Sequence, residues 1–143
     1  MSPRLASLAT GATVLLMVVA PAVGQPTHGE RSKTAKETPA DALKQKLDRG
    51  EKILIVDVRE ANELTEGSIP GAVNIPFSVL PQRMNEIPKN VQVVFTCNTG
   101  RRSSQAAELL QKNGHQASSY CPLSAWKERR LGLQPPKKAE PAK

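Results

Sequence analysis

Two runs rich in β-branched residues constrain the fold of this chain more than any other feature. They read ILIVDV at residues 53–58 and VQVVFT at residues 91–96. Because apolar and polar residues do not alternate in the first run, it predicts a strand that is buried on both faces, as in a parallel sheet covered by helices. The second run predicts another strong strand. Helical patterns lie between the strands. We therefore expect an α/β fold with a central parallel sheet and helices on both faces.

Local signals predict the remaining elements. Thr38 is expected to cap the first helix, with Pro39 in the first helical position and Gly50 at its end. Shorter strands are expected at residues 72–74 and 116–120. Further helices are expected at residues 79–85, 103–113 and 123–130, the last anchored by Trp126.

The two ends of the chain differ in composition from its middle. Residues 1–24 carry Arg4, then a short apolar run and small residues, which is typical of an export signal. A retained anchor is the less favoured alternative, since the run is about half of the roughly 20 residues that cross a bilayer. Residues 25–37 predict a flexible leader and residues 133–143 a disordered basic, Pro-rich tail, which leaves one domain at 38–132. We expect a periplasmic or secreted protein without stable membrane association after signal removal.

The net charge of +7 is spread along the chain, which contains one Trp, one Tyr and two Phe. No basic stripe interleaved with aromatic residues is visible, so we expect no nucleic-acid partner. A basic surface does attract small anions. The sequence suggests neither a metal site nor a cofactor.

A loop of six residues, Cys97 to Arg102, joins the second apolar run to the next helix. It lies beyond the carboxyl end of a parallel strand, where ligands bind in such sheets. A loop that leads into a helix directs backbone N–H groups at one point, which binds anions and favours the thiolate of a cysteine placed there. The residues expected to bind a substrate are Asn98, Thr99, Gly100, Arg101, Arg102 and Ser103.

Three side-chain roles in this loop follow from its tight turn. Gly100 is expected to take a positive φ. Ser103 or Ser104 is expected to cap the helix or to offer a hydroxyl to a bound anion. One of the two arginines is expected to face solvent, because adjacent side chains on a tight loop cannot both point inward.

Two motifs carry a family resemblance. The segment CNTGRRS at residues 97–103 resembles the active-site loop of rhodanese-type sulfurtransferases, cysteine-x-x-glycine-x-arginine-serine. The segments DVRE at 57–60 and EGSIPGAVNIP at 66–76 resemble the upstream signature of that family. The pattern covers nearly all of residues 38–131, and the length and export signal resemble the small periplasmic single-domain members.

The resemblance implies specific roles for these residues. Cys97 is the implied nucleophile, the amides of 98–103 form an anion cradle, and Asp57 and Arg59 form a structural ion pair near the site. The implied reaction moves sulfur from thiosulfate or polysulfide, as small anionic donors, through a persulfide on Cys97 to cyanide or a thiol. The implied mechanism needs no general base.

Two other functions stay open at this stage. A non-catalytic module that binds an anion or a partner protein would share the fold. A phosphatase or arsenate reductase would also place a cysteine in an anion cradle, but by resemblance its loop is one residue longer. Only four residues separate Cys97 from Arg102, and the shorter loop favours sulfur chemistry.

Two departures from the family pattern concern the surroundings of the loop. Ser68 stands where the family usually has His, and the segment from Tyr120 to Ser124 lacks the usual Gly-Gly pair. This segment contains Cys121, the second cysteine of the chain. Either Cys121 forms a structural disulfide with Cys97, or it is a second thiol that resolves a persulfide on Cys97.

Overall fold

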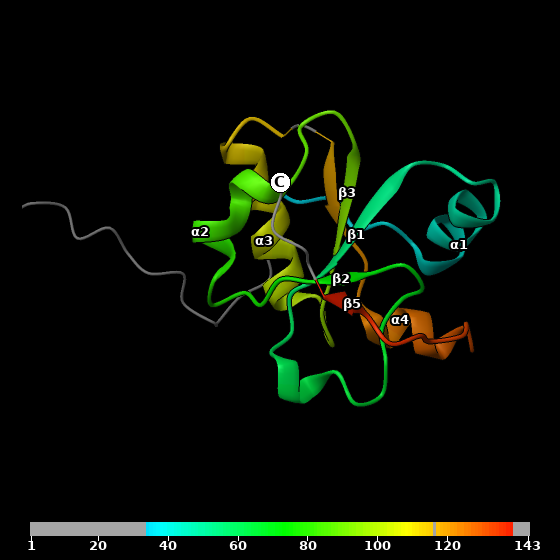
Figure 1. The fold of residues 1–143 in the computed structure, drawn as a ribbon. Coiled ribbons are helices and arrows are strands. Elements are labelled where there is room, and N and C mark those ends of the chain that lie inside the picture. The colour runs from blue at the N-terminus through cyan, green and yellow to red at the C-terminus, as the bar shows by residue number, and fades with distance from the viewer. Residues whose placement is uncertain (1–33, 116, 139–143) are drawn as a thin grey trace, which may run out of the picture.

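A parallel five-stranded sheet forms the centre of the computed structural model, which describes residues 34–115 and 117–138 (Figure 1). The strands lie in the order β4-β3-β1-β2-β5, and every neighbouring pair is parallel. Their bounds are β1 Ile53–Asp57, β2 Val73–Asn74, β3 Gln92–Thr96, β4 Ser118–Tyr120 and β5 Lys137–Lys138. The predicted parallel sheet is therefore confirmed, with the two apolar runs as its central strands.

Helices cover both faces of this sheet, as predicted. Figure 1 shows α2 and α3 on one side of the strands and α1 and α4 on the other. The bounds are α1 Ala40–Asp48, α2 Leu80–Arg83, α3 Arg101–Lys112 and α4 Leu123–Glu128, with 3-10 turns η1 at Ala61–Glu63 and η2 at Met84–Glu86.

The central strands contribute to two separate hydrophobic cores, which explains their unbroken apolar sequence. Val56 and Phe95 face the α2–α3 core, the cluster that also holds Leu110. Their neighbours along the strands face the α1–α4 core, which includes Leu43, Cys121 and Trp126. Trp126 is fully buried, as its predicted anchoring role requires. Burying a Leu or Phe side chain, such as Leu43 or Phe95, stabilises a fold by about 1.5–3 kcal/mol.

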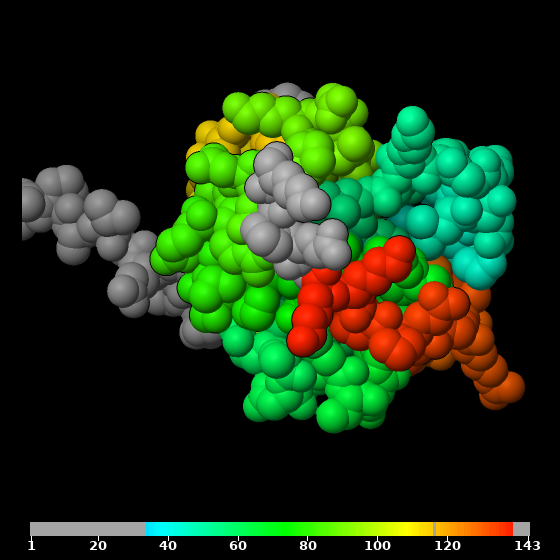
Figure 2. Space-filling model, viewed as in Figure 1, coloured from blue at the N-terminus to red at the C-terminus, as the bar shows by residue number. Residues whose placement is uncertain are grey.

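The ends of the described chain cover the two edges of the sheet. At the β4 edge, the Tyr120 N–H donates to the Lys36 carbonyl at 3.1 Å and the Thr38 N–H donates to the Tyr120 carbonyl at 2.7 Å. At the other edge, residues 131–138 form a C-terminal strap that ends in β5. Ser68 and Gln134 exchange backbone hydrogen bonds of 2.7 and 2.9 Å there. Figure 2 shows the red end of the strap at the surface of the domain.

Because of these contacts, the domain extends beyond the limits expected at residues 38 and 132, to Ala35 at one end and to Lys138 at the other. Ala35 is already buried in the α2–α3 core. At the other end, the prediction of a disordered tail is wrong for 133–138, because backbone pairing of the strap to the sheet does not depend on apolar side chains. The proposed export signal, the leader up to residue 33 and the last five residues lie outside the described residues.

Two helix starts also differ from the sequence prediction. Thr38 does not cap α1, whose N-cap is Pro39. Edge pairing with β4 holds Thr38 instead, and its hydroxyl donates to the Ser119 hydroxyl at 2.8 Å. Helix α3 starts earlier than predicted, with Gly100 as N-cap, so that Ser103 and Ser104 lie in its first turn rather than at the cap.

Within the part of the chain that the structure describes, no helix is both long and apolar enough to span a bilayer.

Candidate functional site

Cys97 follows β3 directly, and the loop after it folds back around the sulfur atom. Its Sγ accepts the backbone N–H groups of Gly100 at 3.2 Å and of Ser103 at 3.4 Å. The Ser103 hydroxyl lies at 3.4 Å from the same sulfur. The residue is only 2% exposed and lies at the amino end of α3, whose dipole is positive there. These donors stabilise a thiolate more than a neutral thiol.

The turn that creates this arrangement requires glycine at position 100. Gly100 has a φ of 90°, in the left-handed region that other L residues rarely adopt. This conformation reverses the chain directly before α3 and brings the N–H of Gly100 onto the sulfur. The prediction of a positive φ is confirmed.

The first turn of α4 supports the outer side of the loop. The Leu123 N–H donates to the Cys97 carbonyl at 2.9 Å, and the Ser124 N–H donates to the Asn98 carbonyl at 3.0 Å. Pro122 precedes them in an extended conformation, with φ −63° and ψ 136°. In the described chain the only non-glycine residue with positive φ is Arg130. The segment from Tyr120 to Ser124 therefore needs no positive φ next to the site, and it does without the Gly-Gly pair that the family resemblance implies.

A buried ion pair joins Asp57 and Arg59 next to the loop, as predicted. The Arg59 Nη2 lies 2.7 Å from the Asp57 Oδ2, and the two side chains are 1% and 0% exposed. Ser68 is also fully buried and donates its hydroxyl to the Asp57 Oδ2 at 2.5 Å. Arg59 donates further to the carbonyls of Glu63 and Gly67, at 3.0 and 2.7 Å. With so many partners the buried charges are compensated.

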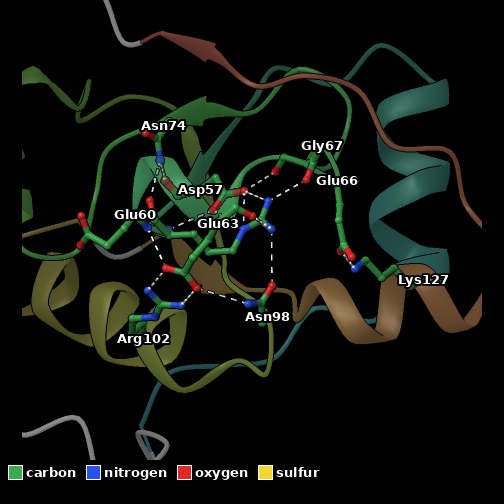
Figure 3. Close-up of polar contacts among 11 residues, drawn as sticks. Asp57, Glu60, Glu63, Glu66, Gly67, Asn74, Asn98, Arg102 and Lys127 are labelled. Carbon is green, nitrogen blue, oxygen red and sulfur yellow. Dashed lines mark hydrogen bonds and ion pairs between the residues drawn. The ribbon is translucent and has the colours of Figure 1, made fainter.

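The structure adds Glu63, a residue that the sequence analysis missed. Its two carboxylate oxygens each accept one Arg102 guanidinium N–H at 2.6 Å, and the Asn98 side-chain amide donates to Oε1 at 3.3 Å (Figure 3). The hydrogen bonds from Arg102 are the main reason that the pKa of Glu63 falls to about 2. Glu60 and Glu63 also form a reciprocal capping box around η1. The spacing of these two glutamates was the available sequence signal.

The two loop arginines differ sharply in their surroundings. Arg102 is 22% exposed and forms the ion pair with Glu63, which raises the pKa of Arg102. Arg101 is exposed and, within the described residues, forms no ion pair. Asn98 and Thr99 are exposed next to it, so the loop contributes neutral polar side chains to the surface around Cys97.

Cys121 lies on the other side of the sheet from Cys97. Cys97 belongs to the α2–α3 core and Cys121 to the α1–α4 core, and both thiols are free. Burial, with a smaller contribution from Glu37, raises the pKa of Cys121 to about 12. The interpretation as a structural disulfide is therefore wrong for this structure, and nothing in it supports a second reactive thiol. Among residues 34–115 and 117–138, no group of three His, Cys, Asp or Glu side chains is placed to hold a metal ion.

Comparison with known proteins finds relatives of this chain. The rhodanese-like domain family matches residues 39–128. A sulfurtransferase of Allochromatium vinosum is 40% identical over 79 residues, which cover 55% of this chain and 74% of the relative. The thiosulfate sulfurtransferase PspE of Escherichia coli is 37% identical over 62 residues, which cover 42% of this chain and 60% of PspE.

A solved rhodanese-like domain protein from Staphylococcus aureus superimposes with a TM-score of 0.61 at 33% identity, covering 69% of this chain and 98% of that one. Among the curated relatives, the matched segment covers from less than half to about three quarters of their own length. The match to the family spans both central strands, the Cys97 loop and α4. The chain belongs to the rhodanese-like domain family.

Proposed function

We propose that this protein is a sulfurtransferase that carries sulfur as a persulfide on Cys97. The observation that carries the proposal is the pair of backbone N–H groups, from Gly100 and Ser103, that point at the Cys97 sulfur. Such donors stabilise both a thiolate and the anion of a persulfide in the same place. The names of the relatives from A. vinosum and E. coli support sulfur transfer as the reaction.

In the first half-reaction the Cys97 thiolate attacks the outer sulfur of thiosulfate. A new S–S bond forms, the S–S bond within thiosulfate breaks, and its electron pair leaves with sulfite. The enzyme keeps the outer sulfur as a persulfide anion. With a polysulfide donor the leaving group is a shorter polysulfide.

In the second half-reaction an acceptor removes the outer sulfur and regenerates the thiolate. Cyanide attacks through carbon and leaves as thiocyanate, whereas a thiolate acceptor leaves as a new persulfide. Neither half-reaction transfers a proton in its bond-making step, so a general base is not required. The export signal expected at residues 1–24 leads us to propose a periplasmic or secreted location for this chemistry.

Mass spectrometry of the purified protein before and after thiosulfate tests the proposal. We expect wild type to gain the mass of one sulfur atom and to lose it on adding cyanide. Cys97→Ser should gain nothing, whereas Cys121→Ser, a matched control in the other core, should behave as wild type. A fully reduced wild type that gains no sulfur from thiosulfate or polysulfide would overturn the proposal.

A further inference from the structure

The pairing of Arg102 with Glu63 limits what this arginine contributes at Cys97. The sequence predicts that a loop arginine holds the anionic donor. In the structure, both terminal nitrogens of Arg102 donate to the two oxygens of Glu63, each at 2.6 Å. Both side chains are partly shielded from water, at 22% and 28% exposure. A positive charge that is matched in this bidentate way offers little attraction to a second anion.

Glu63 also contacts the other end of the loop. Its Oε1 accepts the Asn98 side-chain amide at 3.3 Å, and Asn98 directly follows the nucleophile. Figure 3 shows Glu63 between Arg102 and Asn98. The donors that reach the sulfur, the N–H groups of Gly100 and Ser103, lie between or next to these two anchored residues. One carboxylate therefore clamps both ends of the segment that surrounds the sulfur.

The position of Glu63 is itself fixed. The Glu60 N–H donates to its Oε2 at 2.9 Å. The buried Arg59 donates to the Glu63 carbonyl at 3.0 Å and to the Asn98 Oδ1 at 3.4 Å. The clamp is thus built on the buried ion pair at the end of β1, which is a rigid support for a reactive loop.

We infer that Glu63 is a positioning residue that holds the Cys97 loop through Asn98 and Arg102 and withdraws Arg102 from donor binding. The inference rests on the proposed sulfur transfer at Cys97. The anionic donor then meets the backbone N–H groups of the loop and the exposed Arg101, which has no carboxylate partner in the described part of the chain.

The substitution Glu63→Gln separates positioning of the loop from the simple release of the Arg102 charge. If Glu63 positions the loop, kcat with thiosulfate falls about tenfold or more, because the transition-state geometry is lost, even though the freed Arg102 charge can lower KM. If Glu63 only neutralises Arg102, kcat stays within about twofold of wild type and KM alone falls. A lower KM with an unchanged kcat would overturn the inference.

Two further variants control this comparison. Glu66→Gln also removes a carboxylate that pairs with a cation, Lys127, but it does not touch the loop, so its kinetics should match wild type. Arg102→Lys keeps the charge and loses the bidentate geometry. Its kcat should fall as that of Glu63→Gln does if positioning matters, whereas a wild-type kcat would contradict the inference.

The pH profile of Cys97 alkylation by iodoacetamide gives a readout that does not depend on sulfur transfer. Loss of negative charge alone would shift the midpoint of the profile for Glu63→Gln to lower pH. Loss of the N–H donors from the sulfur shifts it to higher pH, which is the expected result. A shift to lower pH would overturn the inference. A wild type that takes up no sulfur would count against the proposed function, while the direction of this shift would still decide the role of Glu63.

Discussion

At the scale of single residues, Arg130 occupies a backbone conformation that suits glycine. It has a φ of 53° after the end of α4. The Arg130 N–H donates to the Lys127 carbonyl and the Leu131 N–H donates to the Trp126 carbonyl, which together form a Schellman motif. We expect Arg130→Gly to raise the free energy of unfolding by about 1 kcal/mol, because the strain of a left-handed non-glycine residue is removed.

Urea unfolding measures this change. Arg129→Gly is the matched control, since Arg129 has a φ of −80° and gains nothing from glycine. Its unfolding free energy should fall by about 0.5–1 kcal/mol. Equal effects of the two substitutions would contradict the assignment of strain to Arg130.

The ion pair of Glu63 and Arg102 should make stability depend on acid. The pKa of Glu63 is lowered from 4.5 to about 2 in the folded protein. A lowered pKa contributes stability that is present above the ordinary pKa and is lost as the pH falls towards the folded value. We expect about 1–2 kcal/mol of unfolding free energy to disappear between pH 5 and pH 2, after allowance for solvent screening. Urea unfolding of Arg102→Gln should show a smaller acid-induced fall, and an equal fall would refute the assignment.

At the scale of elements, the C-terminal strap depends on a close approach to Gly67. A Cβ atom at this position would lie 3.1 Å from the Gln134 carbonyl oxygen and 3.2 Å from the Leu133 Cβ. Gly67 also has a φ of 87°. Gly71 has nearly the same conformation, with a φ of 84°, but a Cβ atom there would meet no described atom within 4 Å beyond its chain neighbours. A comparison of alanine substitutions at Gly67 and Gly71 therefore separates the effect of backbone strain from the effect of contact with the strap.

We expect Gly71→Ala to lower the unfolding free energy by about 1 kcal/mol through strain alone. Gly67→Ala should cost roughly 1–2 kcal/mol more, since the strap must also shift. Hydrogen exchange of the Ser68 and Gln134 amides should accelerate only in Gly67→Ala. Identical stabilities and exchange rates for the two variants would show that the strap does not pack as described.

At the scale of the whole molecule, apolar patterns made the fold predictable and polar contacts between distant segments limited the prediction. The runs that became β1 and β3 are buried on both faces, so their sequence specifies a covered parallel sheet. The turn at Gly100 and the position of Cys97 directly after β3 were predictable because a strand–turn–helix unit is local in sequence. The Arg102–Glu63 pair joins residues 39 apart, and no local pattern selects such a partner.

The edges of the sheet were the least predictable part of the fold. Gln134 and Lys137 pair through their backbones, which leaves no trace in hydrophobic periodicity. Thr38 looked like a helix cap because its local sequence fits one, but pairing with Tyr120 uses it otherwise. Tertiary contacts thus overrode a local preference worth only about 1 kcal/mol.

The placement of the two cysteines on opposite faces of the sheet has a kinetic consequence. The chain contains only these two thiols, and the sheet lies between them. In the proposed reaction, a sulfur atom loaded onto Cys97 would therefore meet no internal thiol that could expel it as hydrogen sulfide and close an intramolecular disulfide. The lifetime of the loaded form would then depend on encounters with acceptor molecules from outside, and so on their concentration.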